Sequence, residues 1–138
     1  MSVEESRRNQ YRYANQCDEL RRKLRQLDQD YDELRFLRSK VEAYRGDIVK
    51  TQAQRKQMLS AASAWNRDSL AFTQYRTQMA ALVTGSGYVT ALMKLDRSIT
   101  AVQQEMTRVS AESDKAESDL RYAQSMYTYW KNQADLGL

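Results

Sequence analysis

The side chains that could carry chemistry in this chain of 138 residues are its carboxylates, its nine tyrosines and one cysteine, Cys17. Histidine is absent, which excludes a His-based catalytic triad and a Cys/His zinc site, and one cysteine cannot form an internal disulfide. Composition leaves a carboxylate or tyrosine enzyme open, but no pair of carboxylates stands out from the charged surface pattern. We therefore expect a protein that is not an enzyme, with no catalytic residue, no cofactor and no metal site.

Motifs for binding phosphate, calcium or nucleic acid are equally weak. The stretch Gly85-Ser86-Gly87 lacks the Lys-Ser/Thr pair of a P-loop, and no set of acidic residues has the spacing of an EF-hand. The basic cluster at residues 21–25 has no interleaved aromatic residues that could stack on bases. We therefore expect neither a small-molecule substrate nor nucleic acid as the main partner.

The elements that would position any site are long helices. In the C-terminal part, apolar residues recur at alternating spacings of four and three, and this row is called the seam. Its members are Tyr88, Leu92, Leu95, Ile99, Val102, Met106, Val109, Ser113, Ala116, Leu120, Ala123, Tyr127 and Trp130. Only Ser113 is polar. Such a heptad pattern predicts one long helix that packs along another.

The N-terminal part supplies a matching seam. Ser2 and Glu5 have the spacing of a capping box, which predicts a helix from about residue 3. The seam then runs through Tyr13, Cys17, Leu20, Leu24, Leu27, Tyr31 and Leu34, lapses at Arg38, and resumes at Val41 and Ile48. Cys17 is therefore interpreted as a small core residue. Residues 50–64 lose the seam but keep a helix-forming composition.

Breakers are confined to the middle of the chain, because proline is absent and glycine is rare. Asn66, Asp68 and Ser69 are all capable N-caps for a short helix over residues 68–84, and a break follows at 85–87. The predicted fold is all-α: a long, coiled-coil-like antiparallel helical hairpin with a short helix near its closed end. The predicted boundaries of this single domain, 1–138, are as follows: arm 3–62, turn and short helix 63–84, break 85–87, arm 88–134. Exchange of arms between two chains would satisfy the same seam.

More apolar surface is present than one seam can bury. Exposed aromatic and methionine stripes of this kind usually indicate a partner helix. The predicted partner interface consists of Phe36, Tyr44, Met93, Tyr122, Met126, Tyr129 and Trp130. The alternative is that the short middle helix covers part of this surface.

Charge and hydropathy restrict the location of the protein. Residues 1–60 carry 14 Lys/Arg and 10 Asp/Glu, whereas residues 61–138 carry eight of each. No run of 18 apolar residues exists that could form a membrane span, and the N-terminus lacks the apolar core of a signal peptide. We expect a cytoplasmic protein, with export open only through a route that is independent of a signal peptide.

One motif carries a resemblance. The turn residues Trp65-Asn66-Arg67-Asp68 lead to Phe72 and Tyr75, between a long helix and a second helical region. This resembles the WXG-type small helical proteins of type VII secretion, and more closely their larger relatives that are associated with LXG-type toxins. Arg67 stands where that family has glycine, and the family's C-terminal export motif, Tyr-x-x-x-Asp/Glu, is not found after the C-terminal tyrosines.

The resemblance implies a function. Such proteins are adaptors or targeting chaperones that bind the helical N-terminal region of an LXG-type toxin, often with a second small helical protein. Here a partner would have to carry the export signal. Two alternatives stay open: a coiled-coil stalk or escort protein of a flagellar or type III export ATPase, and a structural coiled coil with weak nucleic-acid affinity. A homodimer is a further possibility.

Overall fold

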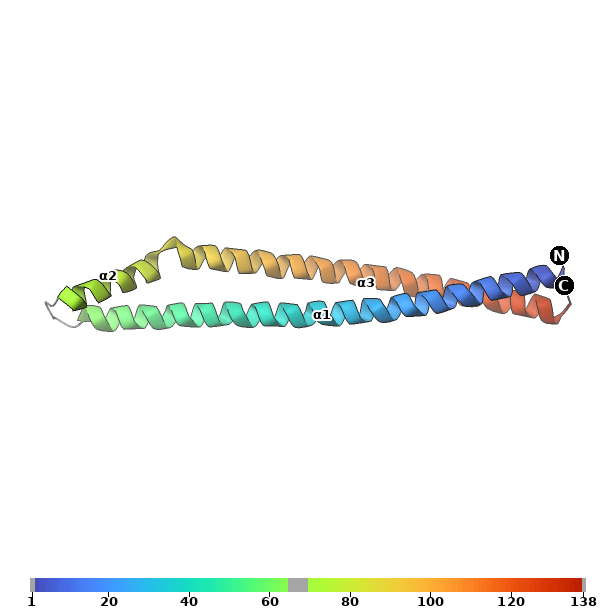
Figure 1. Ribbon diagram of the computed structural model, residues 1–138, viewed down its shortest axis with the longest axis horizontal. Coiled ribbons are helices and arrows are strands. Elements are labelled where there is room, and N and C mark those ends of the chain that lie inside the picture. The colour runs from blue at the N-terminus through green and yellow to red at the C-terminus, as the bar shows by residue number, and fades with distance from the viewer. Residues whose placement is uncertain (1, 65–69, 138) are drawn as a thin grey trace. The chain divides into compact units, whose positions relative to one another are not determined.

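The computed structural model describes residues 2–64 and 70–137 and contains three helices. These are α1 (Val3–Ala64), α2 (Leu70–Thr84) and α3 (Ser86–Asp135). α1 packs antiparallel against α3, so the predicted all-α helical hairpin is confirmed (Figure 1). The contacts divide the chain into unit 1, which joins Met1–Arg35 to Gln104–Leu138, and unit 2, which spans Phe36–Gln103. The single domain over 1–138 stays a prediction.

The start of α1 follows from local sequence. The backbone N–H of Glu5 donates to Ser2 Oγ at 3.2 Å, and the backbone N–H of Ser2 donates to Glu5 Oε2 at 3.3 Å. This reciprocal pair is the expected capping box, and it satisfies donors that the first turn of a helix leaves free. Pairs such as Arg8–Glu4 and Arg21–Asp18 then line the exposed helix surface.

Unit 1 contains a cluster of buried apolar residues from α1 and α3. Leu27, Val109 and Ala116 are buried together, and Leu20, Leu24, Tyr31 and Leu34 pack against them. Further buried seam residues are Cys17, Met106 and Ala123. Cys17 is therefore a core residue, as predicted. The seam also extends to the helix start, because Ser6 is fully buried at the same spacing. Both termini lie at the same end of unit 1 (Figure 1).

The prediction that residues 50–64 lose the seam is wrong. The same spacing continues from Ile48 through Gln52, Arg55, Leu59 and Ala62, and all of these are buried or half-buried. Gln52 and Ala62 are the most buried, at 2% and 7% exposure. The prediction failed because polar side chains occupy two of these positions, so an apolar pattern cannot reveal them.

The predicted helix boundaries are close to the observed ones, with one correction at the break. α1 extends to Ala64, two residues beyond the predicted arm, and α3 begins at Ser86 instead of residue 88. The break is therefore narrowed to Gly85, whose N–H donates to the carbonyl oxygen of Ala81 at 2.8 Å. A Cβ atom at Gly85 would lie 2.5 Å from that same oxygen. The bend between α2 and α3 thus requires glycine for close backbone approach.

Replacing Gly85 with Ala is expected to destabilise unit 2 by about 1–2 kcal/mol, because the new methyl group forces the bend to open. The matched control is Gly46→Ala, since nothing lies within 4 Å of a Cβ there and Gly46 sits inside α1. That change should raise the free energy of unfolding by up to about 1 kcal/mol. Urea unfolding followed by circular dichroism measures both. If Gly85→Ala raised stability as Gly46→Ala does, the close contact would not govern the bend.

Candidate partner-binding surfaces

The C-terminal part of α3 carries an aromatic patch in unit 1, defined as Tyr122, Met126, Tyr129 and Trp130. Tyr122, Met126 and Tyr129 follow each other at spacings of four and three, so they share one helix face. Tyr122 is 61% exposed and Tyr129 is 47% exposed, whereas Met126 and Trp130 are half-buried. The structure therefore brings together these four members of the predicted interface.

Aromatic contacts hold the aromatic patch in place. The Tyr122 ring meets the Tyr13 ring of α1 edge to face, with centroids 6.5 Å apart. Tyr129 meets Trp130 in the same geometry at 5.0 Å. Edge-to-face pairs favour fixed ring positions, so the exposed faces are presented in an ordered way. The indole N–H of Trp130 is buried without an acceptor in the described part of the chain.

The other predicted interface residues lie in unit 2 and do not share one face. Phe36, Tyr44 and Met93 are all at least half exposed. Tyr44 lines a crevice together with Ala91 of α3. Met93 is two residues beyond Ala91, which places it about 200° around the helix. Tyr44 and Met93 therefore belong to different sides of unit 2, and Phe36 lies next to the ammonium group of Lys40, 5.2 Å from the ring centroid.

Of the predicted turn motif, Trp65, Asn66, Arg67 and Asp68 lie outside the described residues. Phe72 is half-buried on α2, and the guanidinium carbon of Arg76 is 5.0 Å from the centre of its ring.

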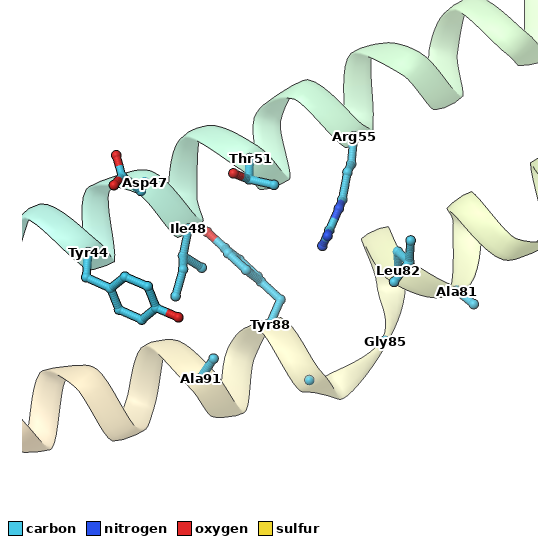
Figure 2. Close-up of a pocket in the computed structure, with 11 residues that line it drawn as sticks. Tyr44, Asp47, Ile48, Thr51, Arg55, Ala81, Leu82, Gly85, Tyr88 and Ala91 are labelled. Carbon is cyan, nitrogen blue, oxygen red and sulfur yellow. The ribbon is translucent and has the colours of Figure 1, made fainter.

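Sequence reasoning missed a hollow at the α2–α3 bend, which we call the bend crevice. Its volume is about 440 Å³, and α1 forms one wall while the bend forms the other (Figure 2). The Tyr88 ring reaches across toward Ile48 and Thr51, and the Arg55 side chain extends toward the corner at Gly85 (Figure 2). The full lining is Tyr44, Asp47, Ile48, Thr51, Arg55, Ala81, Leu82, Gly85, Gly87, Tyr88 and Ala91. In the sequence, the only sign of this crevice was that Arg55 lies at the seam spacing.

Gln52 holds the end of α2 in unit 2. Its Nε2 donates to the carbonyl oxygen of Val83 at 2.8 Å. That carbonyl is one of the last four of α2, which have no partner within their helix. Because α2 has no buried residue among those described, this bond is a principal specific contact between α2 and α1. Gln52 Oε1 is itself buried without a partner in the described residues.

Ion pairs account for the shifted ionisable groups. Arg45 of α1 pairs with Asp96 of α3, with Nε 2.7 Å from Oδ1, and this pairing raises the pKa of Arg45. On α3, Arg108 contacts both Glu105 and Glu112. The Arg108 hydrogen bond lowers the pKa of Glu105 and keeps its carboxylate ionised. The Arg108–Glu105 pair therefore stabilises the folded protein at pH values above the ordinary carboxyl pKa. This stabilisation is lost as pH falls through the lowered pKa of Glu105.

Two further searches concern metals and membranes. Within residues 2–64 and 70–137, no group of three or more Cys, Asp or Glu side chains is placed to hold a metal ion. No helix in the described part of the chain is both long enough and apolar enough to cross a membrane.

Comparisons of this chain with protein-family models, with curated proteins and with solved structures give no match.

Proposed function

We propose that this protein is a non-enzymatic adaptor that binds the helical N-terminal region of an LXG-type toxin and presents it for type VII secretion. The observation that carries the proposal is the aromatic patch, in which Tyr122 and Tyr129 are exposed although their rings are held by neighbours. Aromatic side chains with fixed rings are efficient contact residues, because they bury much area and lose little side-chain entropy. The resemblance of the Trp65–Tyr75 stretch to accessory proteins of LXG toxins supports the identity of the partner.

The mechanism would be physical, without a chemical step. A partner helix that packs on the aromatic patch would cover the two tyrosines and could supply an acceptor for the indole N–H of Trp130. That N–H now costs free energy because it is buried without an acceptor in the described residues. A second small helical protein could complete the bundle. The secretion machinery would then recognise the assembled complex, and a partner would carry the export signal.

The test is co-expression with the helical N-terminal region of an LXG toxin from the native host, followed by size-exclusion chromatography with light scattering and by calorimetry. Tyr122→Glu is expected to weaken binding by about 30-fold or more, since a charge would enter the centre of the contact. Gln124→Glu is the matched control, because Gln124 is exposed on the opposite side of the same helix. The control should bind normally.

Circular dichroism must show that both variants stay helical. If Tyr122→Glu bound the toxin region as tightly as the control, the aromatic patch would not be the interface. If the wild-type protein formed no complex with the toxin region and ran as a dimer, the proposed function would be wrong, and the aromatic patch would be a self-association surface.

A further inference from the structure

The two units differ in net charge. Dividing the chain at residue 60 hides this difference, because unit 1 combines residues from both ends of the chain. Unit 2 carries ten Lys/Arg and four Asp/Glu, a net charge of +6. Unit 1 carries 12 Lys/Arg and 14 Asp/Glu, a net charge of −2. All of the net positive charge of the chain therefore belongs to unit 2.

Within unit 2, the segments that form the bend crevice are poor in carboxylates, and Arg55 is the one cation among its described lining residues. The described segments 48–64 and 70–95 contain no Asp or Glu, and their five cationic residues are Lys50, Arg55, Lys56, Arg76 and Lys94. Asp47 also lines the bend crevice, but its carboxylate turns away from the α2–α3 bend (Figure 2). It precedes Arg55 by eight residues, or about 12 Å along the helix axis. Arg55 is therefore the charged residue at the end of the bend crevice near Gly85 (Figure 2).

Arg55 is the charged side chain that extends into this space. It occupies a seam position and is half-buried, yet no hydrogen bond or ion pair links it to another described residue. Arg45 lies between Val41 and Ile48 at the seam spacing and is also half-buried, but it is paired with Asp96. A partly desolvated guanidinium without a carboxylate gains more from an incoming anion than a solvated surface arginine does.

We propose that the bend crevice is a docking site for an acidic amphipathic helix of a protein partner, and that Arg55 binds a carboxylate of that helix. Ile48, Leu82 and Tyr88 would contact an apolar side chain placed one turn from the carboxylate. The proposal deepens the proposed function, because it names the chemistry of a second contact with the partner. It rests on that function only for the identity of the partner.

The apolar lining favours a protein helix over nucleic acid. Ile48, Leu82 and Tyr88 line the bend crevice, and Leu82 is 49% exposed there. A phosphate backbone would neutralise Arg55 but would not bury these side chains. An amphipathic helix with acidic residues beside its apolar stripe satisfies both.

The direct test uses the full-length protein and a synthetic amphipathic peptide. The peptide carries a stapled helix with Leu at positions i and i+4 and Glu at the flanking positions. A second peptide has Lys in place of every Glu, and a single-stranded oligonucleotide is the third probe. Binding is measured by fluorescence anisotropy at two salt concentrations, and the contact is mapped by the NMR shifts of backbone amides.

The decisive comparison is between the affinities of the Arg55→Glu and Lys56→Glu variants for the acidic peptide. Both variants change the net charge of unit 2 equally, but Lys56 is exposed and does not line the bend crevice. Arg55→Glu is expected to weaken binding of the acidic peptide about tenfold or more, and Lys56→Glu about twofold. The NMR shifts should centre on the residues of the bend crevice.

Four results would overturn the proposal. The first is no binding of the acidic peptide at low salt, and the second is an equal loss of affinity in Arg55→Glu and Lys56→Glu. The third is that the Lys peptide binds as tightly as the acidic peptide. The fourth is that the oligonucleotide binds more tightly than the acidic peptide and loses affinity equally in both variants. The last result would identify a nucleic-acid surface.

The same variants separate this proposal from the proposed function. A toxin complex that survives Arg55→Glu but is lost in Tyr122→Glu would leave the adaptor function intact and remove the role of the bend crevice. Arg55-dependent peptide binding in a protein that binds no toxin region would support the bend crevice and overturn the adaptor function.

Discussion

Val109→Asp is expected to unfold unit 1, with a loss of about 3–5 kcal/mol of stability. Val109 is 2% exposed and packs with Leu27 and Ala116 in the core cluster. A carboxylate there would be buried without a cationic partner. Asp28, Asp32 and Asp114 line the hollow next to Val109 and would add like-charge repulsion.

The control for this prediction is Ala111→Asp, two residues further along α3, where the side chain is exposed. It should cost less than about 1 kcal/mol, mainly through helix propensity. Urea unfolding followed by far-UV circular dichroism compares the two variants with the wild type. Equal unfolding midpoints for the two variants would show that the Leu27–Val109–Ala116 cluster does not stabilise unit 1.

Gln52→Glu is the second change with a large expected effect, about 3 kcal/mol at neutral pH. The substitution replaces the Nε2 donor by a carboxylate oxygen that faces the Val83 carbonyl oxygen. The position is 2% exposed, so water cannot solvate the new charge. Gln54→Glu is the control, because Gln54 is exposed on the same helix and should tolerate the charge.

The effect of Gln52→Glu should depend on pH. Burial and the facing carbonyl raise the pKa of the introduced carboxyl above its value of about 4.3 in the unfolded chain. Below the unfolded-state pKa the group is protonated in both states and can donate to Val83, so the variant approaches the wild type. As pH rises through the raised folded-state pKa, stability is lost.

Unfolding of both proteins at acidic and neutral pH measures this difference. A deficit of the same size at both pH values would mean that the side chain at 52 matters through its shape. No deficit at neutral pH would mean that the contact with Val83 contributes nothing to holding α2.

The candidate surfaces have different origins in the sequence. The aromatic patch was predictable, because Tyr122, Met126 and Tyr129 lie off the seam at a spacing that places them on one helix face. The placement of Tyr44 and Met93 on different sides of unit 2 was not predictable. A heptad pattern identifies the seam. Which residues beside the seam of one helix lie on the same side as those of the other helix depends on how the two helices pack.

The bend crevice could not be derived from the pattern of residues. It arises where Gly85 ends α2, and its walls come from segments that are at least 26 residues apart, as Arg55 and Ala81 are. The role of Arg55 depends on the same arrangement. In the sequence it is one cation among many, whereas in the structure it extends into an apolar hollow without an ion-pair partner among the described residues.

The sequence by itself determined the all-α class, the two long helical arms and the core of unit 1, because apolar residues at alternating spacings of four and three can be buried only along a helix–helix seam. Local chemistry also set the start of α1 at its capping box. Tertiary structure alone decided which polar residues enter the seam. Gln52 is tolerated there because it reaches the free Val83 carbonyl, and Arg45 is tolerated because Asp96 lies 51 residues away in sequence but within 2.7 Å in space. Such pairings depend on distance in the folded chain, which no periodicity encodes.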